Sequence, residues 1–110
     1  MPDHPTDWLD DVTRLTAGAA RRFPRHNEVF HLVSRLAEET GELAQQVNHR
    51  EGMGRKRDRH GEPVLDDLTK EVLDVVCCAV GIAAHYGCLE DLRELTAEKL
   101  ASYTARGWVD

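Results

Sequence analysis

The segment from Val75 to Ala84 constrains the fold more than any other stretch, because every residue in it is apolar or glycine. It belongs to a longer pattern of apolar residues at helical spacing. This pattern predicts a helix that starts just after Pro63, a residue suited to the first turn, and ends at Gly87. A helix that is apolar on all sides must be covered on all sides. The chain has only 110 residues, so we expect a second copy to supply part of that cover.

Three other segments show the same helical spacing and are predicted to be helices: 8–23, 27–48 and 89–104. Thr6 or Asp7 can cap the first of them. Asn27 can cap the second, with Glu28 favourably placed in its first turn. No segment alternates with period two for long enough to form a strand. The sequence therefore predicts an all-α chain of four helices that forms a single domain over residues 1–110.

Composition narrows the class of protein. The formal net charge is −6, which weighs against a main role in binding nucleic acid or acidic membranes. We expect neither a signal peptide nor a membrane span, since there is no charged leader and no apolar run of about 20 residues. The cysteines are odd in number and include the neighbours Cys77 and Cys78, which fits no disulfide framework or zinc motif. We expect reduced thiols in a cytoplasmic protein, and Cys78 to serve in packing.

Acidic residues gather at two places in the predicted helices. Glu39 and Glu42 lie three apart on one flank of the second helix, and Glu71 and Asp74 lie three apart on the third. If the flanks face each other, carboxylates ~4 Å apart repel by roughly 4 kcal/mol at a dielectric of ~20. Unless the carboxylates splay apart or take up protons, such a cluster needs a cation, and hard oxygen ligands suit Mg²⁺ or Mn²⁺. Glu38 falls further round the second helix.

A simpler interpretation is that these acids are solvated surface charges. Arg35 is spaced to pair with Glu38 and Glu39, and Lys70 with three aspartates: Asp66, Asp67 and Asp74. Surface pairs of this kind contribute only about 0.2–0.5 kcal/mol each. Residue types alone leave both interpretations open. Gly41, costly within a helix by up to ~1 kcal/mol, is interpreted as room for a close neighbour.

The acidic residues match a known motif. Glu38-Glu39-x-x-Glu42, followed after 28 residues by Glu71-x-x-Asp74, resembles the EExxE…ExxD signature of the MazG-like all-α nucleoside triphosphate pyrophosphohydrolases. The text LAEETGELAQQV around the first half is also similar to the family's second helix. The resemblance extends from about Val29 to Ala83 and, more weakly, into the C-terminal tail.

The resemblance implies an activity and a site. It implies Mg²⁺-dependent hydrolysis of (deoxy)nucleoside triphosphates to the monophosphate and pyrophosphate, in nucleotide-pool house-cleaning, by a homodimer or tetramer. All five motif acids would be catalytic, and Glu38 would act in the outer shell. The metal ligands would be Glu39, Glu42, Glu71 and Asp74.

The tail also resembles the family, in its Lys…Arg-Pro-Trp ending. The resemblance implies that Lys99, Tyr103 and Arg106 approach the substrate. The sequence departs from the pattern at Tyr103, where asparagine is expected, and at Gly107, where proline is frequent. For Lys99 and Arg106, ordinary solvated charge near a helix end is an equally good interpretation.

Other functions stay open. Phosphoribosyl-ATP pyrophosphohydrolase activity is compatible with the same carboxylates. A di-metal redox bundle usually needs two Glu-x-x-His motifs, and the second helix offers only Glu28-x-x-His31. A non-catalytic helical interaction module is the third alternative. The basic segment 50–63 is predicted to be a loop that could clamp phosphates, and His31 and His49 are predicted to be solvated.

Overall fold

The structure is a computed structural model that describes residues 7–24, 28–52 and 61–110. Within these ranges it contains helices and no strand, so the predicted all-α fold is confirmed. The helices are α1 (Trp8–Arg22), α2 (Val29–Glu51), α4 (Leu65–His85) and α5 (Leu89–Ala105). Most of the basic segment 50–63, for which a phosphate clamp was left open, lies outside the described residues.

Two helix ends follow the sequence closely. The carboxylate of Asp7 caps α1, where its Oδ1 accepts hydrogen bonds from the backbone N–H groups of Leu9 and Asp10. The alternative cap, Thr6, lies outside the described residues. Helix α4 ends just before Gly87, whose φ of 67° is easily adopted only without a Cβ atom.

Three other helix ends differ from the prediction. Glu28 is itself the N-cap of α2 rather than a first-turn residue, and Asn27 lies outside the described part of the chain. Helix α2 continues to Glu51, beyond the predicted end, because the left-handed conformation that closes it is supplied by Gly52 with a φ of 73°. Pro63 precedes the N-cap of α4 and so is not in its first turn.

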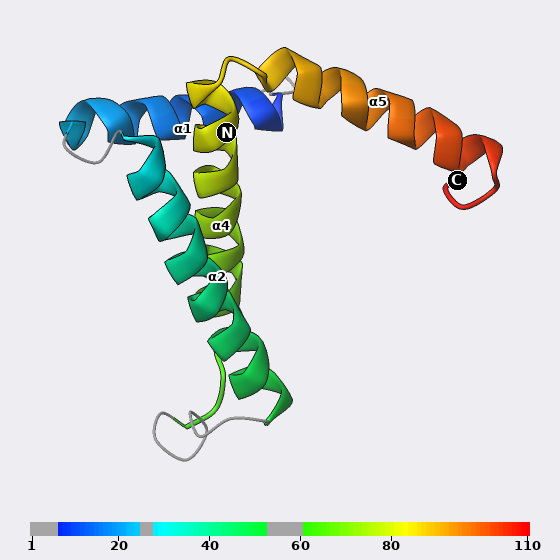
Figure 1. The fold of residues 1–110 in the computed structure, drawn as a ribbon. Coiled ribbons are helices and arrows are strands. Elements are labelled where there is room, and N and C mark those ends of the chain that lie inside the picture. Colours follow the sequence, from blue (N-terminus) through cyan, green and yellow to red (C-terminus); the bar gives the residue numbers. More distant parts are fainter. Residues whose placement is uncertain (1–6, 25–27, 53–60) are drawn as a thin grey trace, which may run out of the picture.

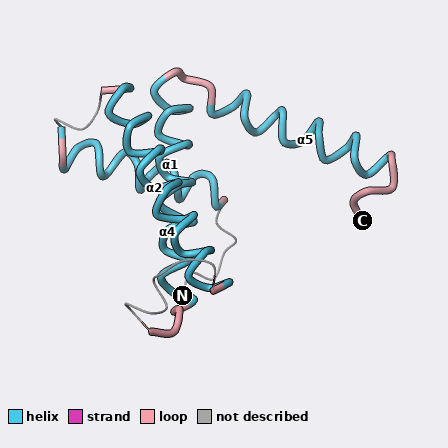
Figure 2. The backbone as a smooth tube through the Cα atoms, turned by 60° about the horizontal axis from the view of Figure 1, so that its bottom comes forward, coloured by secondary structure: helices cyan, strands magenta, loops and turns pink. Residues whose placement is uncertain are grey.

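Helices α2 and α4 run antiparallel side by side, and α1 crosses them near the start of α2 and the end of α4 (Figure 1). Helix α5 leaves this three-helix body and points away from it in both views (Figures 1 and 2). Its first turns are tied to α1 by ion pairs of Arg93 with Asp7 and Asp10. No single helix in the described ranges meets the length and apolarity of a membrane span; α4 and α5 do so only as a pair bent by 117°.

One chain builds only a small core. Among the described residues, the buried apolar side chains are Val12, Cys78 and Val80. The radius of gyration is 17.0 Å, whereas a compact chain of this length has one of about 13 Å. Apolar side chains that belong to the helical stripes of α1, α4 and α5 stay largely exposed: Trp8, Leu15, Phe23, Val72, Leu95 and Leu100.

Two further expectations are wrong. His49 is buried, not solvated, and its Nε2 lies 2.7 Å from the carbonyl oxygen of Gly61. This hydrogen bond joins the end of α2 to the segment that leads into α4. At Gly41 no described atom beyond the adjacent residues and the nearby backbone of α2 lies within 4 Å of the place a Cβ would take, so no close neighbour explains that glycine within one chain.

Candidate metal centre

Three of the predicted acids meet where α2 and α4 run side by side. Glu39 comes from the middle of α2, and Glu71 and Asp74 come from successive turns of α4. One carboxylate oxygen from each lies within 4.8 Å of the others, and all three side chains are half-buried. Because the two helices are antiparallel neighbours, the pair Glu71 and Asp74 on α4 faces Glu39 on α2, and the three side chains form a group of oxygen ligands.

The electrostatics of this group favour a cation. The pKa of Glu39 is raised, chiefly by a hydrogen bond to the Glu71 carboxylate that only protonated Glu39 can donate, and further by burial and the charge of Asp74. With Glu39 ionised, the buried Oε2 of Glu71 accepts no hydrogen bond from the described residues. A buried oxygen without a donor is costly, and a cation would satisfy it.

Lys70 supplies only part of the missing positive charge. Its Nζ lies 2.7 Å from Asp74 Oδ2 and 3.8 Å from Glu71 Oε1. The hydrogen bond with Asp74 is the main cause of the raised pKa of Lys70. Its side chain is 68% exposed, so the pair is weak. One ammonium against three carboxylates leaves an excess charge of −2, which one divalent cation balances.

The other predicted site residues lie outside this group. Glu38 and Glu42 are exposed on α2 and are not among the three clustered acids. Lys99, Tyr103 and Arg106 are carried away from the body with α5 (Figure 1). There the guanidinium of Arg106 lies 4.9 Å from the ring centroid of Trp108, and Tyr103 meets that ring edge-on at 5.1 Å.

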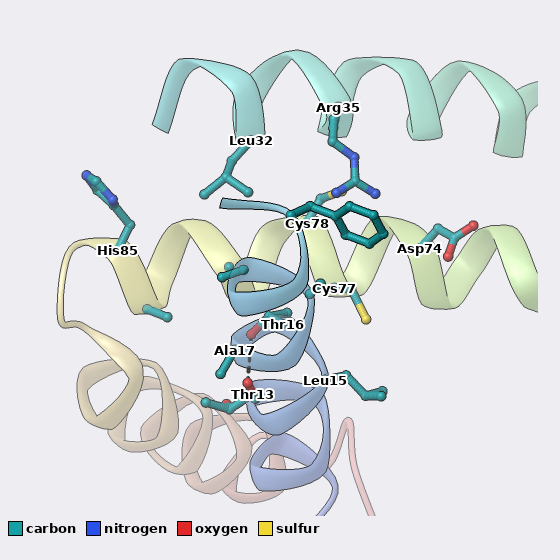
Figure 3. Close-up of a pocket in the computed structure, with 15 residues that line it drawn as sticks. Thr13, Leu15, Thr16, Ala17, Leu32, Arg35, Asp74, Cys77, Cys78 and His85 are labelled. Atoms are coloured by element: carbon teal, nitrogen blue, oxygen red, sulfur yellow. Dashed lines mark hydrogen bonds between the residues drawn. The ribbon is translucent and has the colours of Figure 1, made fainter. Parts of the chain in front are cut away.

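A cavity of about 460 Å³ lies between α1, α2 and α4 and reaches the metal group through Asp74 (Figure 3). Arg35 lines it, and among the described residues no ion pair joins Arg35 to Glu38 or Glu39, the acids that it is spaced to reach. Cys77 and Cys78 also line it, and burial raises the pKa of both thiols. This cavity was not predicted from the sequence. The small residues of α1 and α4 that line it, such as Ala17, Ala20 and Gly81, are the feature of the sequence that could have indicated it.

No family model, curated protein or solved structure matches the chain.

Mg²⁺ is expected to stabilise the fold more strongly as the pH rises. The folded-state pKa of Glu39 is raised from its ordinary value of 4.5, so this group's contribution to stability is fully present below that value. It is lost as the pH rises through the raised pKa. A cation removes this loss, and at 100 times its Kd it adds about 2.7 kcal/mol.

Thermal unfolding with Mg²⁺ and with EDTA, from pH 4 to pH 8, measures this effect as a difference in Tm. The difference should be near zero at pH 4 and should grow as Glu39 ionises. A difference that does not change with pH, or a Tm unaffected by Mg²⁺ and Mn²⁺, would contradict a carboxylate metal centre.

Proposed function

We propose that the chain is a Mg²⁺-dependent nucleoside triphosphate pyrophosphohydrolase of the MazG-like type. The observation that carries the proposal is the meeting of Glu39, Glu71 and Asp74, with oxygens within 4.8 Å of one another. These residues occupy ligand positions in both halves of the EExxE…ExxD motif. The set contains only carboxylate oxygens, which suits Mg²⁺ or Mn²⁺ better than a metal that prefers nitrogen or sulfur.

The reaction is the addition of water across the bond between the α and β phosphates. Water attacks the α phosphorus, the bridging bond to the β phosphate breaks, and a monophosphate and pyrophosphate leave. A bound Mg²⁺ would neutralise phosphate oxygens and lower the pKa of the attacking water. Glu39 from α2 and Glu71 and Asp74 from α4 would hold the ion between two helices.

The working unit is a homodimer in this proposal, with a tetramer as the alternative. The support is the apolar surface that one chain leaves open on α1, α4 and α5. At ~100° per residue, one face of α5 carries Leu92, Leu95, Lys99 and Tyr103. Covering that face with a second copy would also place Lys99 and Tyr103 at the contact between subunits. The cysteines Cys77, Cys78 and Cys88 are free thiols, which supports a reducing, cytoplasmic location.

A panel of nucleoside and deoxynucleoside triphosphates with Mg²⁺, assayed for pyrophosphate, tests the activity. At least one nucleotide is expected to give equimolar monophosphate and pyrophosphate, and EDTA should stop the reaction. In ¹⁸O-labelled water the label should appear in the monophosphate, because the α phosphorus is attacked.

Including phosphoribosyl-ATP in the panel separates the related activity from nucleotide house-cleaning. If no nucleotide releases pyrophosphate while Mn²⁺ or iron still binds, the proposal fails. A non-catalytic or redox role would then be the better interpretation.

A further inference from the structure

The cavity between α1, α2 and α4 has the position expected of a binding site for part of a substrate. Asp74 belongs both to its wall and to the metal group, so the two sites are continuous. Its volume of about 460 Å³ falls within the ~300–1,000 Å³ of small-molecule sites. A ligand held by a cation at Asp74 can therefore extend directly into this cavity.

Arg35 is the cationic group that faces this path. It lies one helical turn before Glu39 on α2, is half-buried, and its side chain points from α2 toward the cavity wall formed by α4 (Figure 3). Among the described residues, no carboxylate forms a hydrogen bond or ion pair with its guanidinium. A half-buried arginine beside a metal centre is suited to a phosphate, which it can bind through two parallel hydrogen bonds.

The rest of the cavity suits an organic group rather than further phosphates. Its α1 and α4 walls carry many small residues, among them Ala17, Ala20, Gly81 and Ala84, beside the larger Leu15, Phe23 and His85. The hydroxyls of Thr13 and Thr16 donate to the carbonyls of Leu9 and Thr13. Toward a ligand these hydroxyls can then only accept, so they suit the hydroxyl of a sugar or the amino group of a base.

The geometry points to one orientation of a nucleotide in this cavity: Arg35 binds the phosphate next to the sugar, and the nucleoside lies between α1 and α4. The β and γ phosphates then extend toward the ligands on α2 and α4. This inference rests on the proposed function, since that function makes the phosphorylated ligand a nucleotide. It adds Arg35 as a substrate-binding residue and the α1–α4 wall as the surface that selects the nucleoside.

Two variants test it. Arg35→Gln removes the charge, and Ala17→Leu fills the cavity from α1. Arg35→Gln is expected to raise the KM for nucleotides, and the Kd of a nucleoside monophosphate without metal, by roughly 10- to 100-fold. Ala17→Leu should raise both by at least about 10-fold, yet leave inhibition by inorganic tripolyphosphate within about twofold of the wild type, since tripolyphosphate carries no nucleoside.

Matched controls are Arg14→Gln on α1 and Ala37→Leu on α2, both at exposed positions outside the cavity. They should keep the wild-type KM. Circular dichroism and thermal unfolding check that each variant is folded, and Ala84→Leu fills the same cavity from α4 if Ala17→Leu unfolds.

The outcomes separate the two proposals. If the wild type releases pyrophosphate and Arg35→Gln and the cavity-filling variants keep its KM, the inference is overturned while the proposed function stands. The inference is also overturned if Ala17→Leu weakens inhibition by tripolyphosphate as much as it weakens the binding of nucleotides. If the wild type releases pyrophosphate from no nucleotide, the proposed function fails whatever the variants bind.

Discussion

Replacing Glu71 with glutamine is expected to reduce Mg²⁺-dependent pyrophosphate release by at least about 100-fold. Mutations that only support metal ligands cost about 10- to 100-fold, so loss of a ligand should cost at least the upper end of that range. Glutamine keeps the shape of the side chain but removes the charge, and its amide nitrogen can donate to the carboxylate of Glu39. The metal-free protein should therefore be at least as stable as the wild type.

Steady-state kinetics and Tm measurements with and without Mg²⁺ check this together. The expected pattern is lost turnover, an unchanged or higher Tm in EDTA, and a lost Mg²⁺ response. Glu51→Gln, the same substitution at an exposed position at the end of α2, the helix that carries Glu39, is the matched control and should keep full activity. Turnover within threefold of the wild type in Glu71→Gln would remove Glu71 from the metal centre.

Glu42→Gln answers a separate question in the same assay. The family resemblance implies that Glu42 is a fourth ligand, whereas the structure leaves it exposed and outside the clustered group. A loss similar to that of Glu71→Gln would mean that Glu42 joins the site when the metal binds. Unchanged turnover would restrict the ligands to Glu39, Glu71 and Asp74.

The helices and most of the acidic cluster could be predicted because they depend on local spacing. The apolar stripes and the capping residues Asp7 and Gly87 act within a few residues of themselves. The acidic pairs, Glu39 with Glu42 and Glu71 with Asp74, follow from the helical repeat. For the two pairs to face each other, α2 and α4 need only be antiparallel neighbours. This arrangement is natural, because elements that follow one another along the chain are usually neighbours in space.

The features that could not be predicted depend on distant contacts. Burial of His49 requires the carbonyl of Gly61, which lies beyond a segment with no periodicity. Arg35 is spaced to pair with acids about one turn away, but the packing of α1 across α4 leaves a cavity that Arg35 lines. The direction of α5 is likewise set by the turn at Gly87 and by Arg93, neither of which is visible in an apolar pattern.

Leu95→Asp is expected to convert the proposed homodimer to a monomer and to remove most of the turnover. Leu95 is 50% exposed in one chain, on the α5 face that the proposed dimer covers. An uncompensated buried charge costs about 3–5 kcal/mol, which corresponds to a roughly 100- to 5,000-fold weaker dimer. Turnover should fall as the dimer is lost, because the same face of α5 also carries Lys99 and Tyr103, two of the predicted substrate-binding residues.

Sedimentation analysis over a range of protein concentrations, together with the pyrophosphate assay, measures both effects. Ala101→Asp is the matched control: it adds the same charge about 120° around α5 from Leu95 and on the side opposite Leu92, Lys99 and Tyr103, at an exposed position. Replacing alanine by aspartate costs up to about 0.7 kcal/mol of helix propensity, a larger penalty than at leucine. A monomer produced only by Leu95→Asp must therefore result from its face of α5 and not from weakening of the helix. A dimer that tolerates Leu95→Asp, or a wild type that is monomeric and fully active, would show that α5 serves some purpose other than joining two copies.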